Sequence, residues 1–193
     1  SSTKGTQKVV VTTNSATAGN LAVNAIDGSS GAALSGVTLT GPSGSSVLSP
    51  ASTLLEKSDL SEAEVAAALG LDGISLTEFN PYAAGVDADN ALAFEKVATQ
   101  VITTVKAISA AAQGSGAAAE AASNAAFSSL ISVVATKATA GETLDLSAAA
   151  DLTAIQTQAA TDLVAVAGVD ATAFNAVLAT AMTAGGNVNT AVA

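Results

Sequence analysis

The sequence predicts a mainly α-helical protein, in which a small N-terminal β element precedes an antiparallel helical bundle. From Ser49 onward, apolar side chains recur at three- and four-residue spacing, which is the period of an amphipathic helix. Residues 1–48 instead carry short alternations of apolar and polar residues between Gly- and Ser-rich turns. We therefore expect a β-rich segment over 1–48 and an Ala-rich bundle over 49–193, with short connections that make neighbouring helices antiparallel.

Three short strands are expected in the N-terminal segment. They lie over 8–13, 21–26 and 37–40, and the second and third end at the turn signals Asp27-Gly28 and Gly41-Pro42. Because an isolated hairpin is only marginally stable, the element is expected either to pack on the helices or to pair with a neighbouring chain.

Two short helices with clear start signals follow the strands. Ser49 as N-cap and Pro50 at the first helical position begin a helix that is expected to end near Ser58. The run Ser-Glu-Ala-Glu over 61–64 has the form of a capping box, and it predicts a helix that stops at Gly70.

Longer helices are predicted beyond a loop over 71–87, in which Phe79 and Tyr82 are expected to hold the loop against the core. The first two are expected over about 89–113 and about 117–138. The third is expected to run from a cap at Asp145 or Ser147 to about 168, and the fourth from a cap at Asp170 to a stop at Gly185-Gly186. Residues beyond that glycine pair are expected to be frayed.

The core is expected to be thin. Hydrophobic residues make up 49% of the chain but aromatic residues only 3%, because about a quarter of the chain is alanine. An alanine methyl buries little area, so close approach of helix backbones has to supply the packing. The four phenylalanines are expected to be anchors.

The charge balance disfavours anionic partners. The chain has sixteen acidic residues against six lysines, with no arginine and no histidine, and a net charge of −10. Binding to nucleic acid or to an anionic membrane surface needs clustered Lys or Arg, which this chain lacks. No run approaches the roughly 18 consecutive apolar residues of a membrane span.

The absent residue types also argue against an enzyme. Without cysteine there is no thiolate nucleophile and no zinc–sulfur site, and without histidine the most frequent general base is missing. The chain likewise lacks the arginine fork that binds carboxylates and phosphates. We expect no catalytic residue and no cofactor.

Asp87, Asp89 and Asn90 are the candidate metal ligands, because three oxygen-bearing side chains stand together in a loop before a helix, and calcium takes six to eight oxygen ligands. The run lacks the glycine and the bidentate glutamate of an EF-hand. The favoured interpretation is that Asp89 caps the helix.

Other polar residues have structural explanations. Glu62 and Glu64 lie two positions apart on a helix and face different ways, and Glu64 is the expected capping-box partner. Lys96 and Lys106 lie off the apolar stripe of their helix and are expected to be solvated. Neither Gly114-Ser115-Gly116 nor Gly185-Gly186 is followed by the Lys-Ser/Thr of a phosphate loop.

One segment resembles a module of large secreted bacterial surface proteins, of the adhesin or surface-layer-like kind. In that module a short β segment ends in a phrase of the type PxGxxVxSPxTTL and leads into an Ala-rich helical part. This chain reads GPSGSSVLSPASTLL over 41–55, with Ala-Ser-Thr where the module more often shows Leu-Thr-Thr. Further matching phrases are LSEAEV over 60–65, ALGL over 68–71 and FNP over 79–81. The likeness covers roughly residues 37–110.

The resemblance implies an exported protein, secreted or held at the cell surface. The chain begins at Ser1 and shows no basic segment followed by an apolar one, so we expect a mature or trimmed chain. The predicted function is structural: a subunit or module of an extracellular bacterial assembly (surface layer, filament or adhesin) that works as a homo-oligomer or beside neighbouring modules. The alternatives are a virion decoration or fibre protein, and a soluble helical domain that binds calcium or a small ligand.

Overall fold

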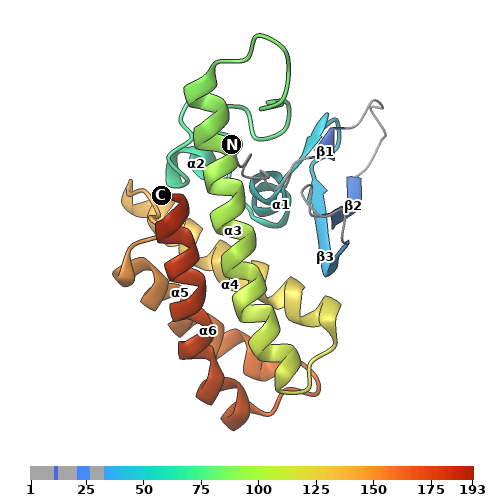
Figure 1. Ribbon diagram of the computed structural model, residues 1–193, viewed down its shortest axis with the longest axis vertical. Coiled ribbons are helices and arrows are strands. Elements are labelled where there is room, and N and C mark those ends of the chain that lie inside the picture. Colours follow the sequence, from blue (N-terminus) through green and yellow to red (C-terminus); the bar gives the residue numbers. More distant parts are fainter. Residues whose placement is uncertain (1–10, 13–20, 27–32) are drawn as a thin grey trace, which may run out of the picture.

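The computed structural model describes residues 11–12, 21–26 and 33–193, and it confirms a mainly helical fold with a small β element (Figure 1). The α-helices of this part of the chain are α1 (Pro50–Lys57), α2 (Glu62–Ala68), α3 (Ala88–Gly114), α4 (Ala119–Ala140), α5 (Ala149–Asp162) and α6 (Ala171–Val192). A 3-10 turn, η1 (Leu163–Ala165), follows α5. None of the described helices is long and apolar enough to cross a membrane.

The strands form two antiparallel pairs. β2 (Leu21–Ile26) pairs with β3 (Ala33–Gly41), and β1 (Val11–Thr12) pairs with β4 (Val47–Leu48). The strand predicted over 21–26 is confirmed. The third strand is longer than predicted, and β4 was not predicted because two residues show no alternation. Of the strand predicted over 8–13, residues 11–12 form β1, and residues 8–10 and 13 lie outside the described part of the chain.

The β element packs on the helices, which is the first of the two alternatives expected from the sequence. Val37, Leu39, Val47 and Leu48 belong to the same buried cluster as the apolar side chains of the bundle. The end of β3 is tied to α1 by hydroxyl groups: the Thr40 N–H donates to Thr53 Oγ1 (2.9 Å), and the Ser52 hydroxyl donates to the Thr40 carbonyl (2.8 Å).

Most of the expected helix starts are confirmed. Ser49 and Ser52 form a reciprocal cap at α1, Ser61 and Glu64 form one at α2, and Asp170 accepts hydrogen bonds from two backbone N–H groups of α6. The prediction for α5 was wrong, because its N-cap is Ala148 and neither Asp145 nor Ser147 caps it. That helix also ends at Asp162, short of the expected 168, and continues only as the 3-10 turn η1.

The bundle is built around α3, which runs alongside α6 and also contacts α4 (Figure 1). Phe94, Phe127 and Phe174 are each no more than 1% exposed, so the prediction that phenylalanines anchor the core is confirmed for these three. The fourth, Phe79, is partly buried and lies against Phe94 with ring centroids 5.4 Å apart, which holds the loop over 71–87 against the core.

The prediction that Gly185-Gly186 stops the last helix was wrong. α6 continues through both glycines to Val192, and both are buried. A Cβ atom at Gly185 would lie 3.2 Å from the Cβ of Ala107 on α3, and one at Gly186 would lie 2.6 Å from Leu152 Cδ1 on α5. The glycines are therefore the sites where α6 approaches its two neighbours closely, and the packing outweighs the low helix propensity of glycine.

A second close approach joins the connection after α3 to the connection before α6. Gly116 has φ +110° and Gly168 has φ +89°, both in the region that favours glycine. A Cβ at Gly116 would lie 2.2 Å from the Gly168 carbonyl oxygen, and the Asp170 N–H donates to the Ser115 carbonyl (2.8 Å). The two connections thus hold each other at one end of the bundle.

This contact predicts opposite effects for two glycines that lie two residues apart. Gly116→Ala should lower the free energy of unfolding by roughly 2 kcal/mol or more, since strain at a left-handed φ and a clash with fixed backbone both act. Gly114→Ala, at a position with no neighbouring atom within 4 Å, should be neutral or stabilising by up to about 1 kcal/mol. Urea unfolding of the two variants measures both effects, and equal stabilities would contradict the proposed contact.

Candidate functional site

The three candidate metal ligands are arranged as a helix start. Asp87, and not Asp89, is the N-cap of α3: its Oδ1 accepts a hydrogen bond from the Asn90 N–H (2.9 Å). The expectation that Asp89 caps was therefore wrong by two residues, and Asp89 lies exposed in the first turn. The geometry supports a capping role for this run. Within the described residues, no three His, Cys, Asp or Glu side chains group in a way that could hold a metal ion.

The two glutamates of α2 serve separate partners, as their spacing predicts. Glu64 Oε2 accepts from the Ser61 N–H (2.8 Å) and from the Ser61 hydroxyl (2.6 Å), and these bonds lower the pKa of Glu64. Glu62 instead reaches the loop: its Oε1 accepts from the Ser75 hydroxyl (2.9 Å) and the Leu76 N–H (2.7 Å). Sequence reasoning missed the role of Glu62, because its partners lie in a loop, and the spacing of residues along the sequence does not predict the path of a loop.

The connection between α4 and α5, residues 141–148, is held by a charged cluster. Lys137 Nζ lies 2.8 Å from Asp151 Oδ1 and 3.1 Å from Glu142 Oε2, and these two contacts raise the pKa of Lys137, with Asp151 as the larger cause. Asp151 Oδ2 also accepts from the Asp145 N–H (2.8 Å). A backbone bond from the Leu144 N–H to the Ala68 carbonyl (2.7 Å) ties the same connection to α2.

Asp145, in the same connection, is bonded to Ser147. Its Oδ1 accepts from the Ser147 hydroxyl (2.6 Å) and from the Ser147 N–H (2.9 Å), which together lower the pKa of Asp145, with a weaker contribution from the charge of Lys96. Lys96 is half-buried, whereas Lys106 is exposed as expected. A carboxylate with a lowered pKa is a hydrogen-bond acceptor and a poor general base near neutral pH.

A buried polar centre joins α3, α6 and the same connection. Asn189 is 0% exposed, and its side-chain amide donates to Thr104 Oγ1 (3.0 Å) and to the Leu146 carbonyl (2.9 Å). The Gln100 amide donates to the Asn189 carbonyl (3.1 Å). Asn189 Oδ1 has no hydrogen-bond partner among the described residues. The segment after Gly186 was predicted to be frayed, and these bonds show why it is helical and fixed.

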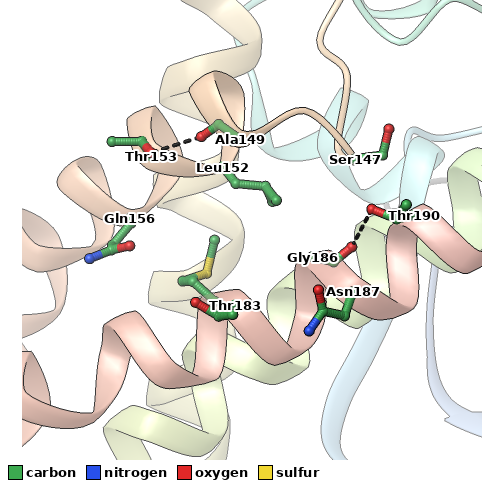
Figure 2. Close-up of a pocket in the computed structure, with 10 residues that line it drawn as sticks. Ser147, Ala149, Leu152, Thr153, Gln156, Thr183, Gly186, Asn187 and Thr190 are labelled. Carbon is green, nitrogen blue, oxygen red and sulfur yellow. Dashed lines mark hydrogen bonds between the residues drawn. The ribbon is translucent and has the colours of Figure 1, made fainter.

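A groove with a mixed lining lies between the start of α5 and the second half of α6 (Figure 2). Its volume is about 260 Å³, with Leu152 and Met182 as apolar lining and hydroxyl or amide side chains around them. The Thr153 and Thr190 hydroxyls are turned to their own helices, donating to the carbonyls of Ala149 (2.7 Å) and Gly186 (2.9 Å) (Figure 2). No titratable side chain lines the groove, so its lining supplies no acid–base group.

The outer edge of β2 is the remaining candidate site. β3 lies between β2 and α1 (Figure 1), and in the described part of the chain β2 is hydrogen-bonded to β3 alone. The opposite edge of β3 is covered near Thr40 by the hydroxyls of Ser52 and Thr53. β2 reads Leu-Ala-Val-Asn-Ala-Ile, without the charge or proline that usually protects an exposed strand edge.

Comparison with known proteins yields no relative. No protein-family model matches the chain, and neither the curated proteins nor the solved structures contain a match.

Asp151 is expected to hold the connection over 141–148 more strongly than Glu142 does. Asp151→Ala leaves the partly buried Asp145 N–H without its acceptor, which costs roughly 1–3 kcal/mol of unfolding free energy. Glu142 also contacts Lys137, but the Glu142 side chain is 62% exposed, so Glu142→Ala should change stability little. Chemical denaturation and amide exchange at Asp145 test the difference, and an equal loss in both variants would contradict it.

Tyr82 is expected to titrate at unusually high pH. Its hydroxyl donates to Glu95 Oε2 (2.5 Å), and partial burial followed by this bond raises the pKa of Tyr82 well above its ordinary value of 10.0. The environment of Tyr82 therefore stabilises the folded protein fully below pH 10.0. This contribution is lost as the pH rises through the higher pKa that Tyr82 has in the folded state. The chain has a single tyrosine and no tryptophan, so ultraviolet absorbance of the tyrosinate reports it alone.

Glu95→Gln should lower the pKa of Tyr82 toward its ordinary value, because the amide removes the carboxylate charge. Glu78→Gln, which neutralises another carboxylate of the same region, should leave the titration unchanged. A wild-type titration midpoint at 10.0 would contradict the Tyr82–Glu95 contact.

Proposed function

We propose that this protein is a non-catalytic structural module of an extracellular bacterial assembly, such as a surface layer, filament or adhesin, and that it joins its neighbours by strand addition. The contact that does this is the outer edge of β2, to which an extended segment of a neighbouring subunit or module adds as a further strand. In such a contact the backbone hydrogen bonds supply affinity, and the side chains of alternate residues supply specificity.

The observation that carries the proposal is the asymmetry of the two sheet edges. At the edge of β3, the Thr40 N–H and carbonyl are hydrogen-bonded to side chains of α1. Among the described residues, β2 has a strand partner on one side and none on the other. An uncharged six-residue edge is a template for pairing with another chain. Strand addition is the interaction that this arrangement favours.

Composition and resemblance support an exported location. The segment over 41–55 that resembles the surface-protein module contains the β4–α1 junction, where Ser49 and Ser52 cap each other and Ser52 also reaches β3. The phrase thus consists of the residues that connect the β element to the bundle. An acidic, arginine-free chain is well suited to remaining soluble at high local concentration.

Binding of a neutral small molecule is a second candidate function, and the groove of Figure 2 favours it. Its volume of about 260 Å³ lies below the ~300–1,000 Å³ that is usual for ligand sites. For that reason we rank it after assembly.

Two adjacent proline substitutions test strand addition. Along an antiparallel strand, successive N–H groups point alternately toward the partner strand and away from it. Of Ala22 and Val23, which stand opposite Thr40 and Leu39, one therefore turns its N–H outward. Proline at the position whose N–H points outward should abolish oligomers and leave Tm unchanged, because no bond to β3 is lost. Proline at the other position removes a bond to β3 and should lower Tm.

The measurement is light scattering coupled to size exclusion over a range of concentrations, with negative-stain imaging of large species. A wild-type protein that remains monomeric throughout, or two proline variants that both assemble normally, would overturn the proposal.

A further inference from the structure

A cleft between α3, the end of α2 and the connection over 141–148 is larger than the groove of Figure 2. Its volume is about 500 Å³, which lies within the ~300–1,000 Å³ that is usual for ligand sites. Apolar side chains line part of the cleft, and Ala193 after α6 lines it as well. The charged and amide side chains of its lining are Lys96, Gln100 and Asp145.

The Gln100 amide is buried, and its oxygen has no partner. The residue is 6% exposed, and its Nε2 donates to the Asn189 carbonyl (3.1 Å), which fixes the orientation of the amide. Its Oε1 accepts no hydrogen bond from the described residues. Oε1 is also not one of the fully enclosed unpartnered atoms of this part of the chain, so it is open to the cleft that Gln100 lines. A donor from outside the chain can therefore bond to it.

Lys96 brings a positive charge to the same cleft. It is half-buried and lies four positions before Gln100 on α3, so the two side chains share a face of the helix. Both ion pairs of the described residues belong to Lys137, and neither includes Lys96. A partly buried ammonium group without a counterion in this part of the chain favours a ligand that carries an anionic group.

Asp145 lines the cleft from the connection and carries the opposite charge. Its bonds to Ser147 lower its pKa, with the charge of Lys96 as a weaker cause, so the carboxylate is ionised at neutral pH. No ion pair of the described residues joins Asp145 to Lys96. Each of the two charged groups can therefore pair with a ligand group of opposite sign.

The presence of both charges selects a zwitterion over a simple ion. A simple anion would pair with Lys96 but would be repelled by Asp145 and by the net charge of −10. A simple cation would pair with Asp145 but would be repelled by Lys96. A free α-amino acid carries both groups on adjacent atoms and has no net charge, and its ammonium group can also donate to Gln100 Oε1.

We propose that this cleft binds a free α-amino acid as its zwitterion. The carboxylate pairs with Lys96, the ammonium group pairs with Asp145 and donates to Gln100 Oε1, and an apolar side chain of the ligand contacts Ala93 and Val97. The inference goes beyond the assembly role proposed above, because it uses no residue of β2 and does not depend on strand addition.

Three related ligands test the proposal by isothermal titration calorimetry on the full chain. L-leucine has both charges and an apolar side chain, N-acetyl-L-leucine lacks the positive charge, and L-leucinamide lacks the negative charge. L-leucine should bind saturably with one site per chain, and each analogue should bind about tenfold more weakly or less, because each leaves one charged group of the cleft unpaired. Absence of L-leucine binding at millimolar concentration, or equal affinity for all three ligands, would overturn the proposal.

Two variants assign each charge of the ligand to its partner. Lys96→Met should remove the preference for L-leucine over L-leucinamide and keep the preference for L-leucine over N-acetyl-L-leucine. Asp145→Asn, which retains an oxygen to accept from Ser147, should have the reverse effect. Lys106→Met, at an exposed position of α3 that does not line the cleft, is the matched control and should change neither preference.

The pattern of these preferences separates a binding role from a structural one. A variant that merely disturbs the fold weakens all three ligands alike and lowers Tm. If Lys96→Met and Asp145→Asn each weaken all three ligands by the same factor, or if Lys106→Met alters the preferences as Lys96→Met does, the proposed site is wrong.

Discussion

The close packing of α6 against α3 and α5 is the contact on which the rest of the bundle depends. Its cause is the absence of side chains at Gly185 and Gly186, which lets the backbone of α6 approach Ala107 on one neighbour and Leu152 on the other. In an alanine-rich core, where each side chain buries little area, backbone proximity has to replace side-chain volume. The buried Asn189 then fixes the helix lengthwise through its bonds to Thr104 and to the Leu146 carbonyl.

The same packing positions the surfaces that the protein presents. With its inner side occupied by α3 and α5, α6 turns an uncharged face outward, while α1 closes one edge of β3 and leaves β2 on the outside of the sheet. Two acidic side chains hold connections between the elements: Glu62 holds the loop over 71–87, and Asp151 holds residues 141–148.

The strand addition proposed at β2 is directional and joins unlike surfaces, so it can continue from one copy to the next. The net charge of −10 opposes indiscriminate association of the copies.

The sequence by itself determined the fold class, the start of α1, α2 and α6, and the burial of Phe94, Phe127 and Phe174, because these depend on local caps and on the 3.6-residue period. It did not determine the course of α6 beyond Gly185, since glycine carries the same local signal whether it ends a helix or lets another helix approach. The cap of α3 at Asp87, the two tasks of Asp151 and the buried bonds of Asn189 were likewise decided by tertiary structure. The partners of Asp151 and Asn189 lie several to many residues away in sequence. Which of Asp87 and Asp89 caps α3 depends on where the preceding loop places the start of the helix. Only packing brings such groups together.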